Sequence, residues 1–413
     1  MHRALFLLIV LAAVASFPVR AQEVDDTIKI KTRVVFLDAL VKDKKTSLPI
    51  SDLTSTNFEV LDNGKPRNIT YFTREGQARK PLALILILDL RDDGAGRFMK
   101  RPEILKSMED ELAKLPPGDE VAIMAMDMTE DEERFWLTEF TNDRAKLAAA
   151  LARVPPLCEQ RNGAPPPEGA VPVRPTIQVT ETQSEGKPDD VVETEVIKGK
   201  NGATVTRKIH RDGSANVSRS DKDGKVQIEM GDIYDMAAAV KDATRKAVET
   251  RPNSQVSIVW VSDGIAPIFF EDRDATEKII IRDNVIFSSL TVEMRTLFKF
   301  LMPVAKPIGG WMGLSIYGSA KYLAQRSGGE AVKVGRPKDY GAGLAKIIGN
   351  LTARYSLGFA LAEDETDDGR MHNLEVRVKA QDQKGKSRKL LVSSRQGYYM
   401  SSTAAKEAAV KAQ

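Results

Sequence analysis

The chain has 413 residues, with a hydrophobic content of 42% and a charged content of 29%. These proportions are typical of globular proteins and exclude a fibrous or disordered chain. Its formal net charge is +3, which gives no electrostatic reason to expect nucleic acid or an anionic membrane as a partner. The length allows two domains.

Residues 1–21 have the pattern of a secretory signal peptide. Arg3 gives a positive start, Leu5 to Ala15 form an apolar stretch, and Val19-Arg20-Ala21 is a small-residue cleavage site. The apolar stretch is shorter than the roughly 20 residues that span a membrane. We expect cleavage near Ala21 and export to the periplasm, the cell surface or the medium, with an uncleaved anchor as the alternative. The leader carries Arg3, Arg20 and no acid, so the mature chain has a net charge of +1.

The single cysteine, Cys158, excludes an internal disulfide. Together with three histidines it offers too few ligands for a structural zinc site. An exported chain without disulfides must be held together by its apolar core, which a chain of this size can provide.

Residues 22–80 are predicted to be rich in β-strands. The stretch IKIKTRVVFLDALV alternates between polar and apolar residues, and NFEVLDNGKPRNITYF carries two short strands. Between those two strands, Asp62-Asn63-Gly64 is a strong hairpin turn.

Residues 81–351 are predicted to form an α/β domain around the strand Leu82–Asp89. Seven of these eight residues are apolar without alternation, which is typical of a strand buried on both faces of a parallel sheet. A polar turn follows at Asp89, where ligands bind in open α/β sheets. The alternative is that Asp89 and Asp93 only cap the next helix. Further strands and helices alternate along the domain, which indicates a parallel sheet with helices on both faces. The predicted strands are 119–127, 133–140 (at an edge), 254–263, 284–292 and 330–334, and the predicted helices are 98–115, 142–154, 233–249, 272–281, 319–325 and 340–351.

Residues 155–230 form a long insertion in this domain. Its first half is poor in apolar residues and rich in Pro, Gly and Glu, a composition typical of disorder. Its second half, ATVTRKIHRDGSANVSRSDKDGKVQIEM, predicts a β-hairpin arm. The sequence leaves open whether the insertion is functional.

Residues 352–400 return to a β pattern, with strands at RYSLGFAL, HNLEVRVKA and RKLLVSSRQGYY, and residues 401–413 form a tail. The two β-rich ends are each too small to bury a core. We expect them to form one antiparallel β-sandwich into which the α/β domain is inserted. Two separate sheets on the α/β domain are the less economical alternative.

The strand LILILD with its polar turn, and the later strand VSIVWVSDG with Asp263 at its end, resemble those of a von Willebrand factor type A (vWA) domain. The flanking segments LPISDLTSTNFEVLDNGKPRNITYF and LTARYSLGFA to SSRQGYY narrow the resemblance to the exported vWA-related proteins of Acidobacteria. It extends over most of residues 28–399 outside the insertion. The implied fold is a doubly wound, Rossmann-like parallel sheet.

The resemblance implies a site for Mg²⁺ or Ca²⁺ at the top of the sheet, built from Asp-x-Ser-x-Ser, a threonine and a later aspartate. Hard cations of this kind prefer oxygen ligands. Asp89 and Asp263 match the two aspartates, Arg91 and Asp93 replace the serines, and Asp232 is the residue nearest to the threonine position. The site is therefore degenerate, and no cofactor is certain.

Arg91 decides between two interpretations of this site. Its guanidinium stays protonated, so it can take the place of the metal and pair with Asp89, Asp232 or Asp263. Alternatively it points outward while Asp89, Asp93, Asp232 and Asp263 hold a cation. We favour the metal-free or weak-metal state because of the charge balance around the ion. In either state the top of the sheet, including Arg91 and Asp92, is a recognition surface.

The sequence contains no nucleophile elbow and no phosphate-binding loop, and we expect no enzyme and no catalytic residue. Of the histidines, neither His210 nor His372 is placed near Asp89 by the predicted topology. The stretch Leu297–Tyr317, with Trp311, is apolar; it marks a protein or membrane contact if exposed, and otherwise folds into the core.

Three functional hypotheses follow. The leading one is an exported vWA protein that mediates protein–protein binding or adhesion through the top of the sheet, with an unidentified protein partner and no nucleic acid. The second is a structural or envelope-assembly protein that uses the β-sandwich and residues 297–317, with a peripheral membrane contact. The third is a hydrolase with an unrecognised carboxylate site.

Overall fold

The computed structural model describes residues 33–74, 79–90, 96–126, 134–159, 171–172, 191–210, 215–231, 236–292, 310, 313–382 and 384–400. The predicted leader, residues 297–309, residues 160–170 and 173–190 of the insertion, and the tail lie outside these ranges. Residues from Val34 onward form one compact unit. None of the described helices combines the length and the apolar character that crossing a membrane requires.

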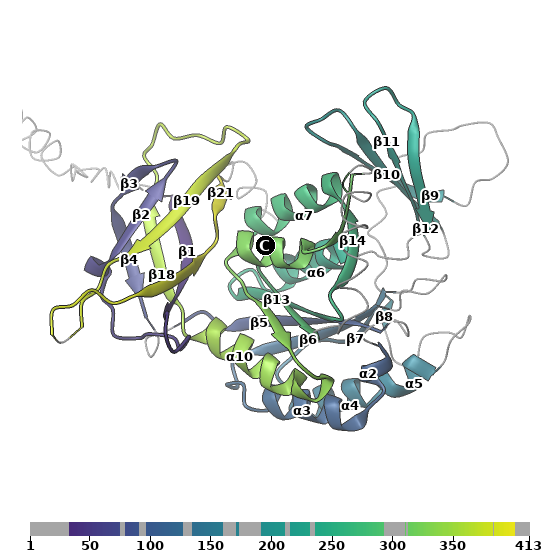
Figure 1. Cartoon of the computed structure of the whole chain (residues 1–413), viewed down its shortest axis with the longest axis horizontal. Coiled ribbons are helices and arrows are strands. Elements are labelled where there is room, and N and C mark those ends of the chain that lie inside the picture. Colours follow the sequence, from purple (N-terminus) through teal and green to yellow (C-terminus); the bar gives the residue numbers. More distant parts are fainter. Residues whose placement is uncertain are drawn as a thin grey trace, which may run out of the picture. The chain divides into compact units, whose positions relative to one another are not determined.

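The central sheet of the described chain is mixed and mostly parallel (Figure 1). Its strand order is β17-β15-β13-β5-β6-β7-β8, and the first five strands of this order run parallel to one another. The last two, β7 and β8, pair antiparallel. The strands are β5 (Leu82–Asp89), β6 (Glu120–Met126), β7 (Arg134–Thr141), β8 (Val171–Pro172), β13 (Gln255–Ser262), β15 (Ile286–Val292) and β17 (Ala331–Val334). This sheet confirms the predicted α/β core with a mostly parallel sheet.

Strand β5 has an apolar sequence because helices cover both of its faces. Leu82, Leu84, Leu86 and Leu88 belong to one core cluster, whereas Ile85 and Ile87 belong to the other. All eight residues of the strand are buried. Burial on both faces removes the alternation that a half-exposed strand would show.

The helices divide between the same two clusters (Figure 1). On the side of the leucines lie α2 (Gly96–Met99), α3 (Pro102–Leu112), α4 (Arg144–Ala152), α5 (Val154–Glu159) and α10 (Tyr340–Thr352). On the side of the isoleucines lie α6 (Met236–Thr250), α7 (Phe270–Arg282) and α9 (Ser319–Ser327). The 3₁₀ turns η1 (Ser55–Asn57) and η2 (Pro337–Asp339) are short.

Two four-stranded antiparallel sheets combine strands from both ends of the chain. Their orders are β20-β1-β18-β4 and β21-β19-β2-β3. Their strands are β1 (Val34–Asp43), β2 (Phe58–Asp62), β3 (Lys65–Arg67), β4 (Ile69–Thr73), β18 (Tyr355–Ala360), β19 (Met371–Val378), β20 (Leu390–Ser394) and β21 (Gly397–Tyr399). Leu37 and Leu357 of the first sheet share an apolar cluster with Val60 and Val376 of the second. The two β-rich ends therefore bury one core together.

The predicted hairpin turn is confirmed. Strands β2 and β3 pair antiparallel, with Asp62 opposite Lys65. Asn63 and Gly64 between them have φ angles of +48° and +80°. This left-handed backbone is what a two-residue hairpin turn needs, and Asn-Gly adopts it most readily.

Three details of the sequence prediction are wrong. Strand β7 is not an edge strand, because β8 pairs with it. The helix predicted to end at Pro155-Pro156 does end there, at Ala152, but the prolines then lie in the first turn of a further helix, α5, where the missing N–H groups cost nothing. The stretch at 388–399 is two strands, β20 and β21, since it pairs first with β1 and then with β19. The predicted helix over 98–115 is two helices, α2 and α3.

The insertion also differs from its prediction. Instead of a hairpin arm, it forms a four-stranded antiparallel sheet in the order β12-β11-β10-β9, here called the insertion sheet. Its strands are β9 (Val191–Lys198), β10 (Thr204–His210), β11 (Ala215–Ser220) and β12 (Val226–Gly231). A separate pair, β14 (Ile265–Phe269) and β16 (Leu314–Tyr317), was not predicted, and β16 takes up the end of the apolar stretch 297–317.

Candidate functional site

Two predicted acidic residues meet at the carboxyl edge of the central sheet. Asp89 is the last residue of β5, and Asp263 directly follows β13. These strands are parallel neighbours with Leu88 opposite Val261, so Asp89 lies beside Ser262. Strand β6 pairs with one edge of β5 and β13 with the other, so the order of the strands changes direction at β5. In open α/β sheets such a switch point is where ligands bind.

The hydroxyl of Ser262 links the two carboxylates. Its Oγ lies 2.6 Å from Oδ2 of Asp89 and 3.3 Å from Oδ1 of Asp263. A serine hydroxyl has one proton, so the shorter contact is the one to which it donates. The amide of Gly264 donates to the same Oγ at 3.2 Å. Ser262 is therefore the centre of the acidic pair.

The backbone around this pair is held from two sides. The amide of Ile265 donates to Oδ1 of Asp263 at 2.9 Å, which closes a tight turn with Gly264 at a φ of +90°. From the start of α10, the hydroxyl of the fully buried Tyr340 donates to the carbonyl of Ser262 at 3.1 Å. These contacts hold the backbone at Ser262 and keep Oδ1 of Asp263 beside the Ser262 hydroxyl.

Both carboxylates are withdrawn from solvent. Asp89 is 0% exposed and Asp263 is 4% exposed. Burying carboxylates is costly unless hydrogen bonds or positive charges compensate. The described oxygens are of the kind that Mg²⁺ and Ca²⁺ prefer, but two carboxylates and a hydroxyl fall short of the six to eight oxygens of a calcium site. Within the described ranges, no group of three or more metal-ligating side chains comes together.

The other predicted site residues lie outside the described ranges. They are Arg91, Asp92, Asp93, Asp232 and Trp311. The predictions that Asp93 and Asp232 join Asp89, that Arg91 replaces a cation and that Trp311 contacts a partner therefore remain predictions. Ser262 and Tyr340 were missed, although Ser262 stands next to Asp263 in the motif VSDG.

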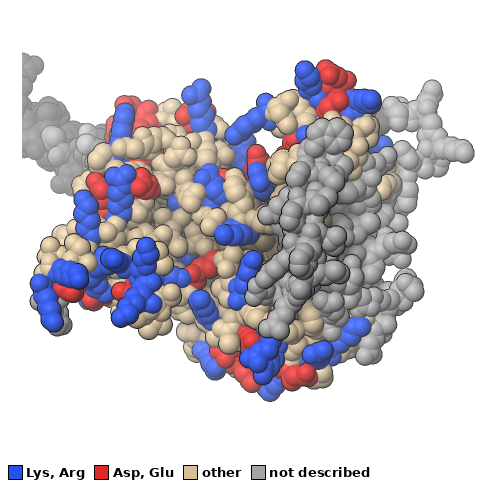
Figure 2. Space-filling view, in the orientation of Figure 1, with Lys and Arg blue, Asp and Glu red and all other residues tan. Residues whose placement is uncertain are grey.

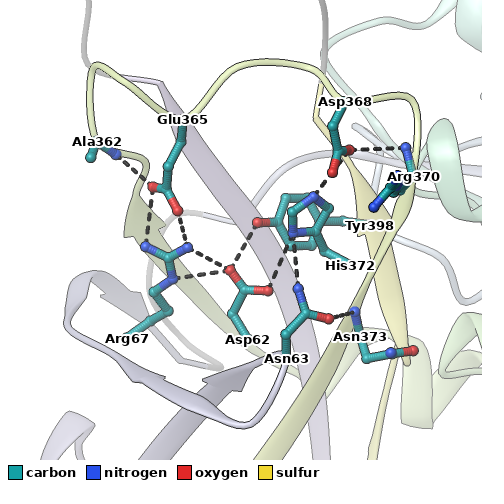
Figure 3. A network of polar contacts seen from close by, with 10 residues as sticks. All are labelled: Asp62, Asn63, Arg67, Ala362, Glu365, Asp368, Arg370, His372, Asn373 and Tyr398. Atoms are coloured by element: carbon teal, nitrogen blue, oxygen red, sulfur yellow. Dashed lines mark hydrogen bonds and ion pairs between the residues drawn. The ribbon is translucent and has the colours of Figure 1, made fainter.

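A second polar cluster lies in the antiparallel sheets and was not predicted (Figure 3). Asp62, at 3% exposure, accepts hydrogen bonds from Arg67 Nε and from the Tyr398 hydroxyl, both at 3.0 Å. Burial and the charge of Asp62 raise the pKa of Tyr398, so its hydroxyl stays protonated and donates. Arg67 also pairs with Glu365. The cluster thus joins the β2–β3 hairpin to the C-terminal strands.

His372 belongs to this cluster and not to the acidic pair. Its Nδ1 lies 3.6 Å from Asp62 Oδ1, and its Nε2 lies 3.3 Å from Asp368 Oδ1 (Figure 3). The amide of Arg370 and the ring of His372 hold the pKa of Asp368 below its usual value. These contacts form a structural network that attaches the loop around Asp368 to β19.

No protein-family model matches the chain, and no curated protein matches it. Among solved structures, the chain is similar to a von Willebrand factor type A protein from Catenulispora acidiphila, with 9% identity, a TM-score of 0.36, and coverage of 84% of this chain and 75% of that one. It is also similar to the three N-terminal domains of the type V pili tip protein Mfa5 from Porphyromonas gingivalis, with 15% identity, a TM-score of 0.14, and coverage of 30% and 20%. Superpositions at this level carry no argument about function.

Proposed function

We propose that this chain is an exported vWA-type protein that binds a protein partner through the carboxyl edge of its central sheet. The observation that carries the proposal is the acidic pair, Asp89 and Asp263, joined through Ser262 at the switch point of a parallel sheet. In this proposal residues 1–21 are a signal peptide, and the two antiparallel sheets, which share a core, are the layers of a β-sandwich.

The proposed role is binding and not catalysis. Arrangements that attack a substrate need a nucleophile and a base that the substrate can reach. Ser262 donates to the Asp89 carboxylate, but both residues are 0% exposed, so this hydroxyl is not open to a substrate. The two carboxylates instead suit the holding of a cation or of the Arg91 guanidinium at this edge of the sheet. The described face of the molecule has basic and acidic side chains interspersed, in keeping with its small net charge (Figure 2).

The proposed site is a degenerate metal site in which Arg91 takes the place of the cation. Asp93 and Asp232 complete the acidic set in this proposal. An arginine neutralises buried carboxylates without a bound ion. If Mg²⁺ or Ca²⁺ were bound, Asp89, Asp93, Asp232 and Asp263 would hold it, and it would offer a coordination position to a carboxylate of the partner.

Thermal melting with added Ca²⁺ or Mg²⁺ tests the metal part of the proposal. A ligand that binds only the folded state raises the melting temperature. We expect no shift for the full chain and a shift for Arg91→Ser, which restores a hydroxyl. A shift in the unaltered chain that Asp89→Asn abolishes would overturn the metal-free site.

Retention of partners on the immobilised chain tests the binding part. Envelope extracts are passed over the unaltered chain, Asp263→Asn, Arg91→Glu and the control Asp110→Asn, whose side chain is 54% exposed on α3. We expect one set of proteins to be retained by the unaltered chain and the control, and lost from both site variants. Equal retention by all four would place recognition elsewhere, and hydrolytic activity that depends on Asp89 would make the chain an enzyme.

A further inference from the structure

A groove of about 700 Å³ runs along the exposed side of α7 and shares no residue with the acidic pair. We call it the α7 groove. One wall is the β9–β10 turn with Lys198 and Lys200, and the other is formed by Tyr322 and Arg326 of α9 with Tyr399 of β21. Its volume is within the range of about 300–1,000 Å³ that ligand sites have.

The acidic side chains of the groove are each neutralised by an arginine. Glu271 accepts from Arg219 at 3.0 Å, Asp274 from Arg273 at 3.0 Å, and Glu277 from Arg326 at 2.6 Å. Burial opposes the ionisation of Glu271, but its hydrogen bonds, chiefly those from Arg219, outweigh burial and hold its pKa below the usual value. These acids therefore contribute no net negative charge to the groove.

The lysines of the groove are not neutralised in this way. Lys198, Lys200 and Lys278 line it, and within the described part of the chain no ion pair joins any of them to a carboxylate. The Lys278 ammonium lies 5.9 Å from the centre of the Tyr399 ring. The groove thus has three positive charges without an acidic partner, and an anionic ligand would complement them.

Aromatic rings supply apolar contact area beside these lysines. Tyr322, Tyr399 and Phe270 all line the groove. Burial and the neighbouring Glu277 raise the pKa of Tyr322 to about 12, so the ring stays neutral and its hydroxyl donates to Glu277 at 2.5 Å. Tyrosines of this kind give rigid contact surfaces in protein interfaces.

We propose that the α7 groove binds an acidic peptide segment of a partner protein. Its Asp and Glu side chains contact Lys198, Lys200 and Lys278, and an apolar side chain between them packs on Tyr322 and Tyr399. A peptide fits better than a nucleic acid because a peptide backbone offers N–H groups to the carboxylate oxygens of Asp274 and Glu277, whereas a phosphodiester backbone has no donor to offer them. A concave groove also fits a chain segment better than a lipid surface.

Fluorescence anisotropy with the full chain tests this proposal. The probe is a labelled peptide of alternating Glu and Tyr, and the same peptide with Gln for Glu is the uncharged comparison. We expect the acidic probe to bind, with an affinity that falls as salt is added. Replacing Lys198, Lys200 and Lys278 by Gln should weaken binding roughly five- to hundredfold, since three partly exposed ion pairs are lost.

The control replaces three exposed lysines outside the groove, Lys222, Lys225 and Lys346, by Gln, which changes the net charge equally. The acidic probe should still bind to this control and to Asp89→Asn. Because Asp89→Asn alters the acidic pair and leaves the groove unchanged, a failure of the groove proposal can be told apart from a failure of the proposed role of the acidic pair. Equal loss in both lysine triples, no loss in the groove triple, or no binding of the probe would overturn the proposal. Stronger displacement of the probe by phosphatidylserine vesicles or by single-stranded poly-dT than by unlabelled acidic peptide would show the wrong class of ligand.

Discussion

The central sheet and the insertion sheet belong to one compact unit but are held by different interactions. Strand β5 and its neighbours are buried by apolar side chains on both faces. The insertion sheet packs on β14 through a small apolar cluster that includes Val205, Val217 and Phe269, and it contacts α6 and α7 through buried ions. Its inward-facing positions thus alternate between valines and charged groups.

The buried ions of the insertion sheet form two groups. In one, Arg207 of β10 and Lys241 of α6 share the carboxylates of Asp272 and Glu195 at 2.8 to 3.0 Å. In the other, Arg219 of β11 pairs with Glu271. In a buried ion pair, the electrostatic attraction is about as large as the free energy lost by desolvating the two ions. The burial of apolar side chains, by contrast, stabilises the folded state. The comparison teaches that the central sheet supplies stability, while the ions set where and how the insertion sheet is attached.

The largest effect is expected in the central sheet. Leu86→Ala removes a side chain that is 0% exposed and should lower the free energy of unfolding by about 2–5 kcal/mol. Leu48→Ala, at a position 65% exposed, is the matched control and should change it by less than about 0.5 kcal/mol. Urea unfolding measures both. A similar small change in the two variants would contradict the role of apolar packing on β5.

A smaller and local effect is expected from Asp272→Ala. The variant leaves Arg207 and Lys241 buried with one acid fewer, at a cost of up to about 3 kcal/mol. Amide hydrogen exchange should rise in β9 to β12 while the main unfolding transition of the central sheet stays in place. The control is Asp274→Ala, which removes a carboxylate whose side chain is 48% exposed. Loss of the main transition in Asp272→Ala would mean that the insertion sheet is part of the same cooperative core.

The smallest effect is expected from acid. The folded state holds the pKa of Glu271 below its unfolded value, so this carboxylate stabilises the fold above the unfolded pKa of about 4.3 and loses that contribution as the pH falls through the folded pKa. Limited proteolysis of the insertion sheet should therefore increase below about pH 4. In Glu271→Gln, the proteolysis of the insertion sheet should depend less strongly on pH. If this dependence were the same as in the unaltered chain, other carboxylates would be responsible for it.

Much of the fold followed from the sequence because local patterns dominate in its best-buried parts. The unbroken apolar run of β5 and the Asn-Gly turn at 63–64 each have one main structural meaning, and both predictions are confirmed. The insertion was predicted only as a β-hairpin arm, and the packing of its sheet was missed because Arg207 and Arg219 occupy inward-facing positions. A strand that has arginines on its buried face is predicted from its sequence to be exposed to solvent.

The acidic pair could be predicted only in part. Asp89 follows from the rule that ligands bind at the carboxyl ends of parallel strands, whereas Asp263 was predicted from the resemblance to a vWA domain. The contacts of Ser262 and Tyr340 depend on the register of β13 and on the placement of α10, which no local pattern fixes. The cluster around Asp62 joins residues some 300 positions apart, such as Asp62 and Tyr398, so no local signal announces it.

The pairing of β1 with β18 and of β2 with β19 has a consequence for biosynthesis. When β1 to β4 leave the ribosome, the strands that complete their sheets have not yet been made, and closing so long a loop is entropically costly. The central sheet has its main partners nearer in the chain and can form first. Until residues 355–399 are synthesised, the N-terminal strands therefore expose Leu37, Val60 and unpaired strand edges. These must be shielded from other chains to avoid aggregation.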